Sequence, residues 1–205
     1  MTHQGPPPHM PTAKAARRDW LGLALGVALI ALTVPAGLVY TFSAAVMPNL
    51  ADADDRTFFE VMQGYNRNPV FPVSFTAAFL LLVVVAILSR GRTGRGFAWV
   101  VAALALFGAV FILTIGFHIP LNDQIDKVGD PAVATDLAQV REDVEGPWVV
   151  GNLLRVVLVT ASLGALARAL VLHGRRSSGP QDHGGSPTIP YTATPHSPAR
   201  DTMRP

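Results

Sequence analysis

Four long runs without a charged side chain limit what this chain can fold into. They cover residues 20–49, 68–89, 96–122 and 146–167, and the last is interrupted only by Arg155. A helix rises ~1.5 Å per residue, so each run is long enough to cross a hydrocarbon layer of ~30 Å. Uninterrupted apolar runs of this length are typical of transmembrane helices. The sequence therefore predicts an all-α integral membrane protein built as a four-helix bundle.

Composition agrees with a membrane protein and excludes several kinds of chemistry. Half of the residues are hydrophobic (50%) and only 15% are charged, against roughly a quarter charged in soluble domains. The chain has no cysteine, which excludes disulfides, thiolate catalysis, iron–sulfur clusters and cysteine-ligated zinc. Its positive charge lies in short flanks of the apolar runs, where such charge sets membrane orientation. The lipid bilayer is the predicted partner, and nucleic acid is not.

Charged residues alternate between the two sides of the predicted bundle. Basic residues lie before residue 20, between residues 90 and 95, and after residue 167, whereas residues 52–67 and 123–145 are mainly acidic. The positive-inside rule therefore predicts that both termini are cytoplasmic, at the plasma membrane if the chain is bacterial. A signal peptide cleaved near residues 43–45 is the alternative, but its apolar region would be far longer than the usual ~7–15 residues.

The predicted organisation is one membrane domain between two tails. The domain covers residues 19–173, with spans at about 20–47, 69–89, 96–119 and 147–172. Residues 1–18 and 174–205 are expected to be disordered, because the first tail is basic and proline-rich and the second is rich in proline, glycine, serine and threonine.

Short helices are expected in both extracytoplasmic connections. Residues 52–66 open with acidic side chains that suit a helix N-terminus, and residues 132–144 predict a second surface helix. Pro120 is expected to end or distort the third span. Pro147 is expected at the first helical position of the fourth span, where proline is well tolerated.

Arg155 is the most informative single residue of the chain. It lies well inside the fourth run, where an arginine costs about 2.5 kcal/mol or more unless it snorkels, meets water or finds a partner. Trp148, Asn152 and Arg155 are spaced four and three residues apart, so they share one face of a helix. A polar stripe on a membrane helix is expected to point into the bundle.

Polar residues from several segments are expected to meet Arg155 at the extracytoplasmic end. The candidate catalytic residues are Arg155 and His118, and the candidate substrate-binding residues are Gln63, Asn66, Asn122, Trp148 and Asn152. One cation, several amides, an imidazole and aromatic walls suit a flat, weakly acidic organic molecule. Arg155 could stabilise a phenolate or enolate, and His118 could take or shuttle a proton.

A purely structural role is the alternative for these residues. Amides and arginines often hold membrane helices together, and Arg155 could pair with Asp123, Asp126 or a backbone carbonyl. No metal site is predicted, since neither an HExxH motif nor a carboxylate–histidine cluster accompanies His118. The sequence also lacks a Walker loop and a GxSxG motif, so nucleotide-binding and hydrolase functions have no support.

Four short motifs occur in order at or next to the ends of the four predicted spans. They are Met47-Pro48, Met62-Gln63-x-x-Asn66, His118-Ile119-Pro120-Leu121-Asn122 and Trp148-x-x-x-Asn152-x-x-Arg155. In this order they resemble the anthrone oxygenase-like membrane family, long described as a domain of unknown function, over about residues 20–172. Relatives commonly have Asn-Val-Pro-Leu-Asn in the third motif, so His118 departs from the family pattern.

The resemblance implies a four-helix membrane protein and two classes of function. In some fungal polyketide pathways, relatives oxidise an anthrone to an anthraquinone with O₂ and no evident metal or flavin, which implies a monooxygenase without a cofactor. Arg155 and the amides would then stabilise an oxyanion, with His118 as a base. The alternative is a non-catalytic membrane protein that binds a lipid, a quinone or a partner helix at the same place.

Overall fold

The computed structural model describes residues 13–91 and 94–177, and within these ranges it contains helices and no strands. The elements are α1 (Ala13–Thr41), the π-helical turn η1 (Phe42–Val46), α2 (Met47–Ala51), α3 (Asp55–Asn66), α4 (Val70–Leu88), α5 (Arg95–Leu113), the π-helical turn η2 (Thr114–His118), α6 (Ile119–Lys127) and α7 (Leu137–Ser177). Four stretches are long and apolar enough to cross a membrane: Trp20–Ala51, Val70–Leu88, Arg95–Lys127 and Leu137–Arg176. The prediction of an all-α membrane protein with four spanning helices is confirmed.

The predicted tails lie mostly outside the described residues. Helix α1 begins at Ala13, inside the predicted tail 1–18, and α7 continues to Ser177, past the predicted start of the second tail at residue 174. Helical structure therefore extends at both ends beyond the range 19–173, and the division into one membrane domain and two tails stays a prediction.

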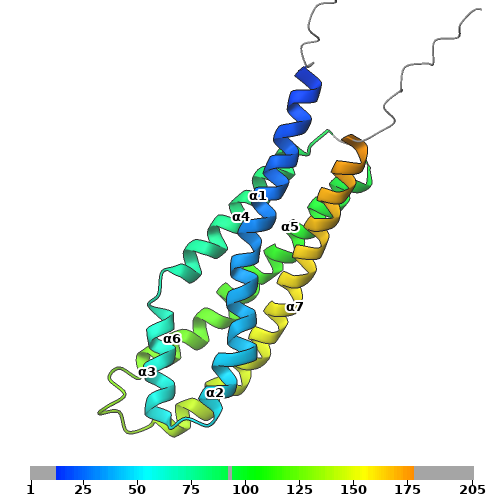
Figure 1. Cartoon of the computed structure of the whole chain (residues 1–205). Coiled ribbons are helices and arrows are strands. Elements are labelled where there is room, and N and C mark those ends of the chain that lie inside the picture. The colour runs from blue at the N-terminus through cyan, green and yellow to red at the C-terminus, as the bar shows by residue number, and fades with distance from the viewer. Residues whose placement is uncertain (1–12, 92–93, 178–205) are drawn as a thin grey trace, which may run out of the picture.

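Each of the four long helices runs antiparallel to its neighbours, so the bundle has two distinct ends (Figure 1). The turn between α4 and α5 lies at the same end as the start of α1 and the end of α7. We call the opposite end, formed by α2, α3, α6 and the first turns of α7, the cap. The cap carries the acidic segments and the other end carries Arg90, Arg95, Arg175 and Arg176. This separation agrees with the predicted charge alternation, and which end faces the cytoplasm stays a prediction.

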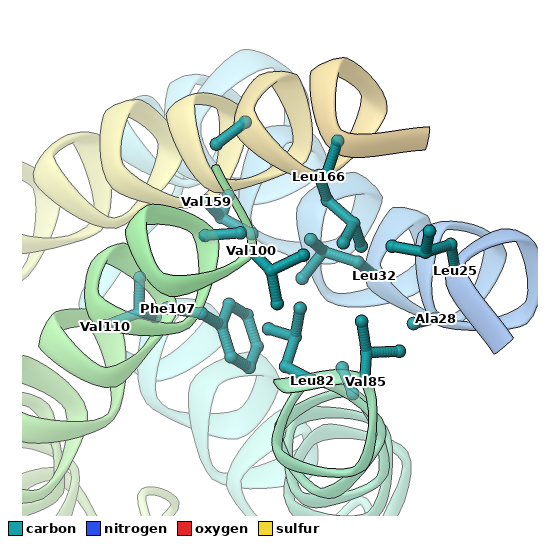
Figure 2. Close-up of a cluster of buried hydrophobic side chains, with 14 of the residues drawn as sticks. Leu25, Ala28, Leu32, Leu82, Val85, Val100, Phe107, Val110, Val159 and Leu166 are labelled. Carbon is teal, nitrogen blue, oxygen red and sulfur yellow. The ribbon is translucent and has the colours of Figure 1, made fainter. Parts of the chain in front are cut away.

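Apolar side chains spaced alternately three and four residues apart hold the bundle together (Figure 2). On α4 they are Phe75, Ala78, Leu82 and Val85, and on α5 they are Val100, Ala103, Phe107 and Val110. A mean repeat of 3.5 residues keeps one stripe of each helix facing its neighbours along the whole contact, as in coiled coils. These residues are nearly inaccessible, whereas the other faces of the same helices are apolar and exposed, as a lipid environment requires.

The same spacing on α7 places Arg155 in the core stripe. Trp148, Asn152, Arg155, Val159, Ser162, Leu166 and Ala169 are all buried along one line of this helix. Ser162 Oγ donates a hydrogen bond to the Ala103 carbonyl of α5 at 2.8 Å. The polar stripe of α7 therefore faces the bundle interior, as predicted.

Two prolines widen the helices just before the cap. Pro48 and Pro120 each lack an amide hydrogen, and a proline ring clashes with the carbonyl four residues earlier. The preceding residues bond one position further back, from Met47 N to the Phe42 carbonyl and from Ile119 N to the Thr114 carbonyl. These bonds create η1 and η2. Pro120 thus distorts the third span without ending it.

The prediction that Pro147 is at the first helical position is wrong, because α7 starts at Leu137 and passes through that proline. A separate helix at residues 132–144 is therefore not observed. Gly146 eases the passage, since the clash of a proline ring with the preceding residue is reduced when that residue has no Cβ. Leu137, Val140 and Val144 also pack on the apolar cluster of the cap, which stabilises this first part of the helix.

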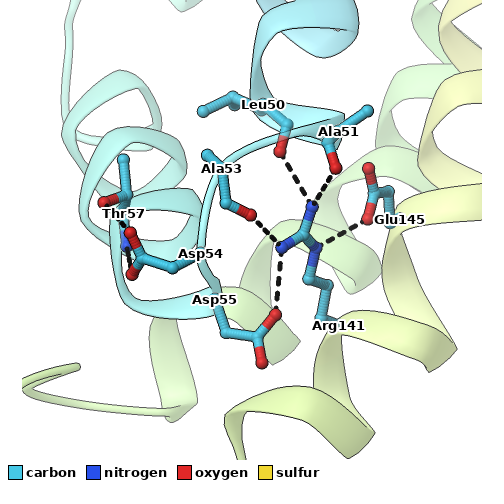
Figure 3. Close-up of polar contacts among 8 residues, drawn as sticks. All are labelled: Leu50, Ala51, Ala53, Asp54, Asp55, Thr57, Arg141 and Glu145. Atoms are coloured by element: carbon cyan, nitrogen blue, oxygen red, sulfur yellow. Dashed lines mark hydrogen bonds and ion pairs between the residues drawn. The ribbon is translucent and has the colours of Figure 1, made fainter.

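Arg141 fastens the start of α7 to the rest of the cap (Figure 3). Its guanidinium donates hydrogen bonds to the carbonyls of Leu50, Ala51 and Ala53, at 2.8, 3.3 and 2.8 Å. It also forms ion pairs with Asp55 at 2.9 Å and Glu145 at 2.7 Å, and it lies 4.7 Å from the Phe58 ring centre. One side chain thereby binds three carbonyls at and just after the end of α2, where the supply of helical donors ends.

Asp54 begins α3 next to this cluster. Its carboxylate accepts hydrogen bonds from the Thr57 hydroxyl at 2.7 Å and the Thr57 amide at 3.0 Å. These bonds favour the charged form and lower the pKa of Asp54. The helix that carries Gln63 and Asn66 is therefore fixed at its N-terminus.

We expect Arg141→Leu to destabilise the protein by about 2 kcal/mol or more, because three carbonyls and two carboxylates lose a charged donor. In a chain of this size that corresponds to a fall in Tm of roughly 4–8 °C, measured by thermal unfolding in detergent. The control is Arg56→Leu, which removes the exposed pair of Arg56 with Glu60 and should leave Tm nearly unchanged. Equal falls in Tm for the two variants would contradict the stabilising role given to Arg141.

Candidate functional site

A cavity of about 340 Å³ lies below the cap and is bounded by all four spanning segments. Its apolar and aromatic lining consists of Val39, Phe42, Met62, Phe71, Pro72, Phe75, Phe111, Ile115, Ile119 and Trp148. Its polar lining consists of Tyr65, Asn66, Thr76, Thr114, Asn122, Asn152 and Arg155. The π-helical turns contribute Phe42, Thr114 and Ile115, so the two prolines shape this space. The structure brings together five of the seven predicted site residues around it.

Arg155 is the charged group of the cavity. It is 9% exposed, and its Nη2 donates a hydrogen bond to Asn152 Oδ1 at 2.8 Å. Its Nε has no hydrogen-bond partner, and the guanidinium lies 5.6 Å from the ring centre of Trp148. Among the described residues no carboxylate lies within ion-pair distance of it. The alternative partners Asp123 and Asp126 are therefore not in contact with Arg155.

Asn152 positions Arg155 and joins α7 to the first span. Its Nδ2 donates to the Val39 carbonyl at 2.9 Å and to Ser43 Oγ at 2.8 Å. With both donor bonds made, only the amide oxygen is left, and that oxygen accepts from Arg155. The orientation of the amide is thus fixed by η1, and Asn152 holds the guanidinium in place at the cavity wall.

A second hydrogen-bonded group closes the cavity toward the cap. Trp148 Nε1 donates to Asn122 Oδ1 at 2.9 Å. Asn66 Nδ2 donates to the Asn122 carbonyl and to Asp126 Oδ1, both at 3.3 Å. The indole packs on Phe42, with ring centres 5.2 Å apart. Asn122 therefore links α3, α6 and α7 at the boundary between the cavity and the acidic surface of the cap.

Two of the predicted site residues do not line the cavity. Gln63 is 3% exposed and donates to the carbonyls of Ile125 and Gly129, at 3.1 and 2.9 Å, so it connects α3 to the end of α6. His118 is fully buried behind Trp148, with the two rings edge to face at 5.6 Å. Neither of its ring nitrogens makes a hydrogen bond, although carbonyls of Leu113 and Trp148 lie near the ring.

Aromatic walls were expected from the sequence, but the four phenylalanines that form them, Phe42, Phe71, Phe75 and Phe111, were not predicted. Phe42 contacts Tyr65 and Phe71 edge to face, with ring centres 4.8 and 5.6 Å apart, and Phe111 packs against Phe79. Ser43 also escaped prediction, although it holds Asn152. The available signal was the proline two residues after each π-helical turn, which marks where a span bends around a site. No group of three potential metal-ligand residues is found in the described part of the chain.

Gly151 leaves room for the two aromatic rings beside Trp148. A Cβ at this position would lie 2.6 Å from Phe117 Cε1 and 2.8 Å from His118 Cε1. Because His118 is fully enclosed, the ring has little space into which it can move.

We therefore expect Gly151→Ala to destabilise the protein by about 1–3 kcal/mol, the range for added atoms in a packed core. The control is Gly164→Ala on the same helix, where a Cβ meets nothing within 4 Å. That change should be neutral or stabilising by up to ~1 kcal/mol, because alanine favours helix more than glycine does. The measurement is the Tm of both variants in detergent. A Gly151→Ala protein with the Tm of the wild type would contradict the close packing of Phe117 and His118 against Gly151.

Comparison with known proteins assigns the chain to a family. The model of the family described as anthrone oxygenase matches residues 58–165, more than half of the chain. This match covers α3 from Phe58 onward, all of α4 to α6, and α7 as far as Ala165. No curated protein and no solved structure matches the chain. The chain belongs to the anthrone oxygenase family.

Proposed function

We propose that this protein oxidises a lipophilic polycyclic phenol with O₂ in the cavity below the cap, without a cofactor. The observation that carries the proposal is the guanidinium of Arg155, which is buried at an aromatic cavity and has no carboxylate partner among the described residues. The family match supports the same class of chemistry. We also propose that both termini face the cytoplasm, as the charge alternation predicts.

Charge favours an anionic ligand in this cavity. The lining residues include one arginine and no aspartate or glutamate. A ligand that carries one negative oxygen would supply the missing counter-charge and accept the donors that Arg155 leaves unused. A fixed cation in a site that excludes water stabilises such an oxyanion more strongly than water does. Arg155 would therefore favour the ionised form of a weakly acidic phenol or of the enol of an anthrone.

Shape favours a flat aromatic ligand. The volume of about 340 Å³ lies at the lower end of the ~300–1,000 Å³ range of small-molecule sites. Phe42, Phe71, Phe75 and Phe111 contribute rings to its wall. These rings can stack on a polycyclic system, while Arg155 and Asn122 lie where polar oxygens can be bound. A fused aromatic with oxygen at one edge matches this arrangement.

The proposed reaction balances without a redox cofactor. Loss of a proton from the methylene carbon of an anthrone gives an electron-rich anthranolate, whose oxygen Arg155 stabilises. The same carbon transfers electrons to O₂ and forms a carbon–oxygen bond, which gives a hydroperoxide after protonation. Loss of the second hydrogen from that carbon and cleavage of the O–O bond release water and leave the second carbonyl. One O₂ is consumed, and one anthraquinone and one water are formed.

The residues take different parts in this proposal. Arg155 binds the oxyanion, Asn152 positions Arg155, and Trp148, Asn122 and Asn66 form the polar end of the binding site. His118 and Gln63 lie outside the cavity lining, so we assign them structural support with no substrate contact. The first proton then leaves to water, and acidification of the substrate by Arg155 replaces a strong general base.

Non-catalytic binding is the alternative, and one observation favours it. Most polar side chains at the cavity already bond to the protein, as Asn152 does to Val39 and Ser43. A membrane protein that binds a lipid, a quinone or a partner helix could use the same bonds only to hold its helices together. Turnover of a phenolic substrate separates the two functions.

We expect Arg155→Leu to reduce O₂-dependent oxidation of hydroxyanthrones by about 100-fold or more, the typical loss when an oxyanion donor is removed. The measurement is oxygen uptake and quinone absorbance in detergent, above the spontaneous rate. Arg155→Lys keeps a charge and should retain part of the activity. Arg168→Leu, the same change at an exposed position of α7, is the matched control and should leave turnover intact.

Folding of each variant is checked by circular dichroism and thermal unfolding. Wild-type rates equal to the blank with every anthrone would reject the oxygenase function and leave the binding function. Full activity in a folded Arg155→Leu protein would reject the role of the guanidinium.

A further inference from the structure

The lining of the cavity is buried on one side and exposed on the other. The residues from α1, η1 and α7 are buried, namely Val39, Phe42, Trp148, Asn152 and Arg155. On the opposite side, Pro72 and Thr76 of α4 are exposed, and so are Ile115 of η2 and Ile119 of α6, at 61% and 44%. We call these four residues the side opening. The cavity therefore meets the outside of the bundle between α4 and the third span.

Contacts between α4 and α5 show why the opening lies at this level. Phe79 packs on Phe111 with ring centres 4.8 Å apart, and Phe75 stacks near Phe107 at 6.0 Å. These rings close the interface toward the middle of the bundle. Nearer the cap, the third span enters η2, which packs against α7. The π-helical turn η2 thus lies at the level where α4 and the third span no longer cover the cavity.

The side opening lies at the depth of the hydrocarbon layer. Ile115 precedes the nearest charged residue of its span, Asp123, by eight positions, and Thr76 follows Arg67 by nine. At ~1.5 Å per residue, both lie roughly 12 Å or more from these charges along the helix, whereas Ile119 and Pro72 form the edge of the opening nearer the cap, at roughly 6–8 Å. An uncharged surface at this distance from the polar boundary faces acyl chains in a bilayer.

On the cap side of the cavity, unlike at the side opening, polar contacts cross the path that a ligand would take. Asn66 is bonded to the Asn122 carbonyl and to Asp126, and Trp148 is bonded to the Asn122 side chain. Tyr65 lines the cavity here and is 37% exposed, and it packs edge to face on Phe42 and Phe71. A polycyclic ligand that passed here would have to break several of these contacts. At the side opening, the exposed side chains of Ile115 and Ile119 are aliphatic and make no such polar contact.

From this geometry we infer that the ligand reaches Arg155 from the bilayer through the side opening. The identity of the ligand rests on the proposed function, whereas the route rests on the exposure of the lining. Arg155 lies on the wall opposite the opening, so a ligand enters with its polar oxygen leading and its apolar part nearest the lipid. The substrate class is accordingly a phenol dissolved in the membrane, and O₂ arrives from the same phase.

The route is tested first without any ligand. Because the chain has no cysteine, a single spin label can be attached at Thr114→Cys inside the cavity, in nanodiscs. Collisions with O₂, which concentrates in lipid, and with a water-soluble nickel chelate are measured by electron paramagnetic resonance. Ile112→Cys, on an exposed residue of α5 outside the cavity lining, is the lipid reference. Asp123→Cys, on an exposed residue of α6, is the water reference.

We expect the label at Thr114 to collide with O₂ nearly as often as the label at Ile112, and rarely with nickel. Adding Ile115→Trp should lower its O₂ collisions several-fold, whereas adding Val73→Trp, an exposed α4 residue outside the lining, should not. Nickel collisions as frequent as at Asp123, or no collisions with either reagent, would overturn the inference. A label at Val39→Cys, on a buried residue of the cavity lining, gives a second reading if the Thr114 variant does not fold.

Ligand kinetics form the second arm of the test. A hydroxyanthraquinone, followed by its own fluorescence, should associate with Ile115→Trp proteoliposomes about ten-fold more slowly than with wild type. Ile112→Trp should stay within about two-fold of wild type. An unchanged association rate in Ile115→Trp would overturn the side route. A wild type that binds no hydroxyanthraquinone would reject the proposed substrate class, while the spin-label result would still decide the route.

Discussion

The hydrogen bond between Asn152 and Arg155 is the interaction on which the site depends. A guanidinium in the core of a membrane bundle is costly unless it is solvated by protein groups. Here the side-chain amide of Asn152 binds the guanidinium of Arg155, and the same amide binds the Val39 carbonyl and Ser43 of the first span. The bond therefore fixes the position of the charge and the approach of α7 to α1 together. A carboxylate in place of the amide would neutralise the arginine and leave no attraction for an anionic ligand.

The incomplete bonding of Arg155 separates this site from a purely structural contact. Polar groups that hold membrane helices together are usually bonded to one another, because lipid offers no alternative partner. Asn152 and Trp148 follow that rule. Arg155 does not, since its Nε lacks a partner and its guanidinium borders a cavity. The structure thus keeps an unused donor of a buried cation at the cavity, next to Asn152 and Trp148, whose own donors are bonded, which is the arrangement that electrostatic catalysis or anion binding requires.

Sequence reasoning succeeded where helical periodicity is regular and failed where it is interrupted. The four spans, and the inward direction of Trp148, Asn152 and Arg155, follow from uncharged length and three-to-four spacing. His118 lies within η2, where one extra residue in the turn rotates the following side chains by about 100° relative to an α-helix. His118 does not line the cavity in this structure, and its catalytic role stays a prediction. Gln63 does not line the cavity either, because the carbonyls of Ile125 and Gly129 bind its amide, and no spacing in the sequence reveals these carbonyls.

The reactants and the products of the proposed reaction differ in polarity, and so do the two boundaries of the cavity. Both reactants, a polycyclic phenol and O₂, dissolve better in lipid than in water, whereas a proton and one water molecule are polar and have to leave. The side opening is lined by apolar or weakly polar residues, and the cap boundary by Asn66, Asn122 and the neighbouring Asp126. The Asn66–Asn122–Asp126 contacts lie between the cavity and the acidic surface of the cap, so this is the boundary at which polar products are nearest to water, whereas the side opening is the boundary nearest to the lipid.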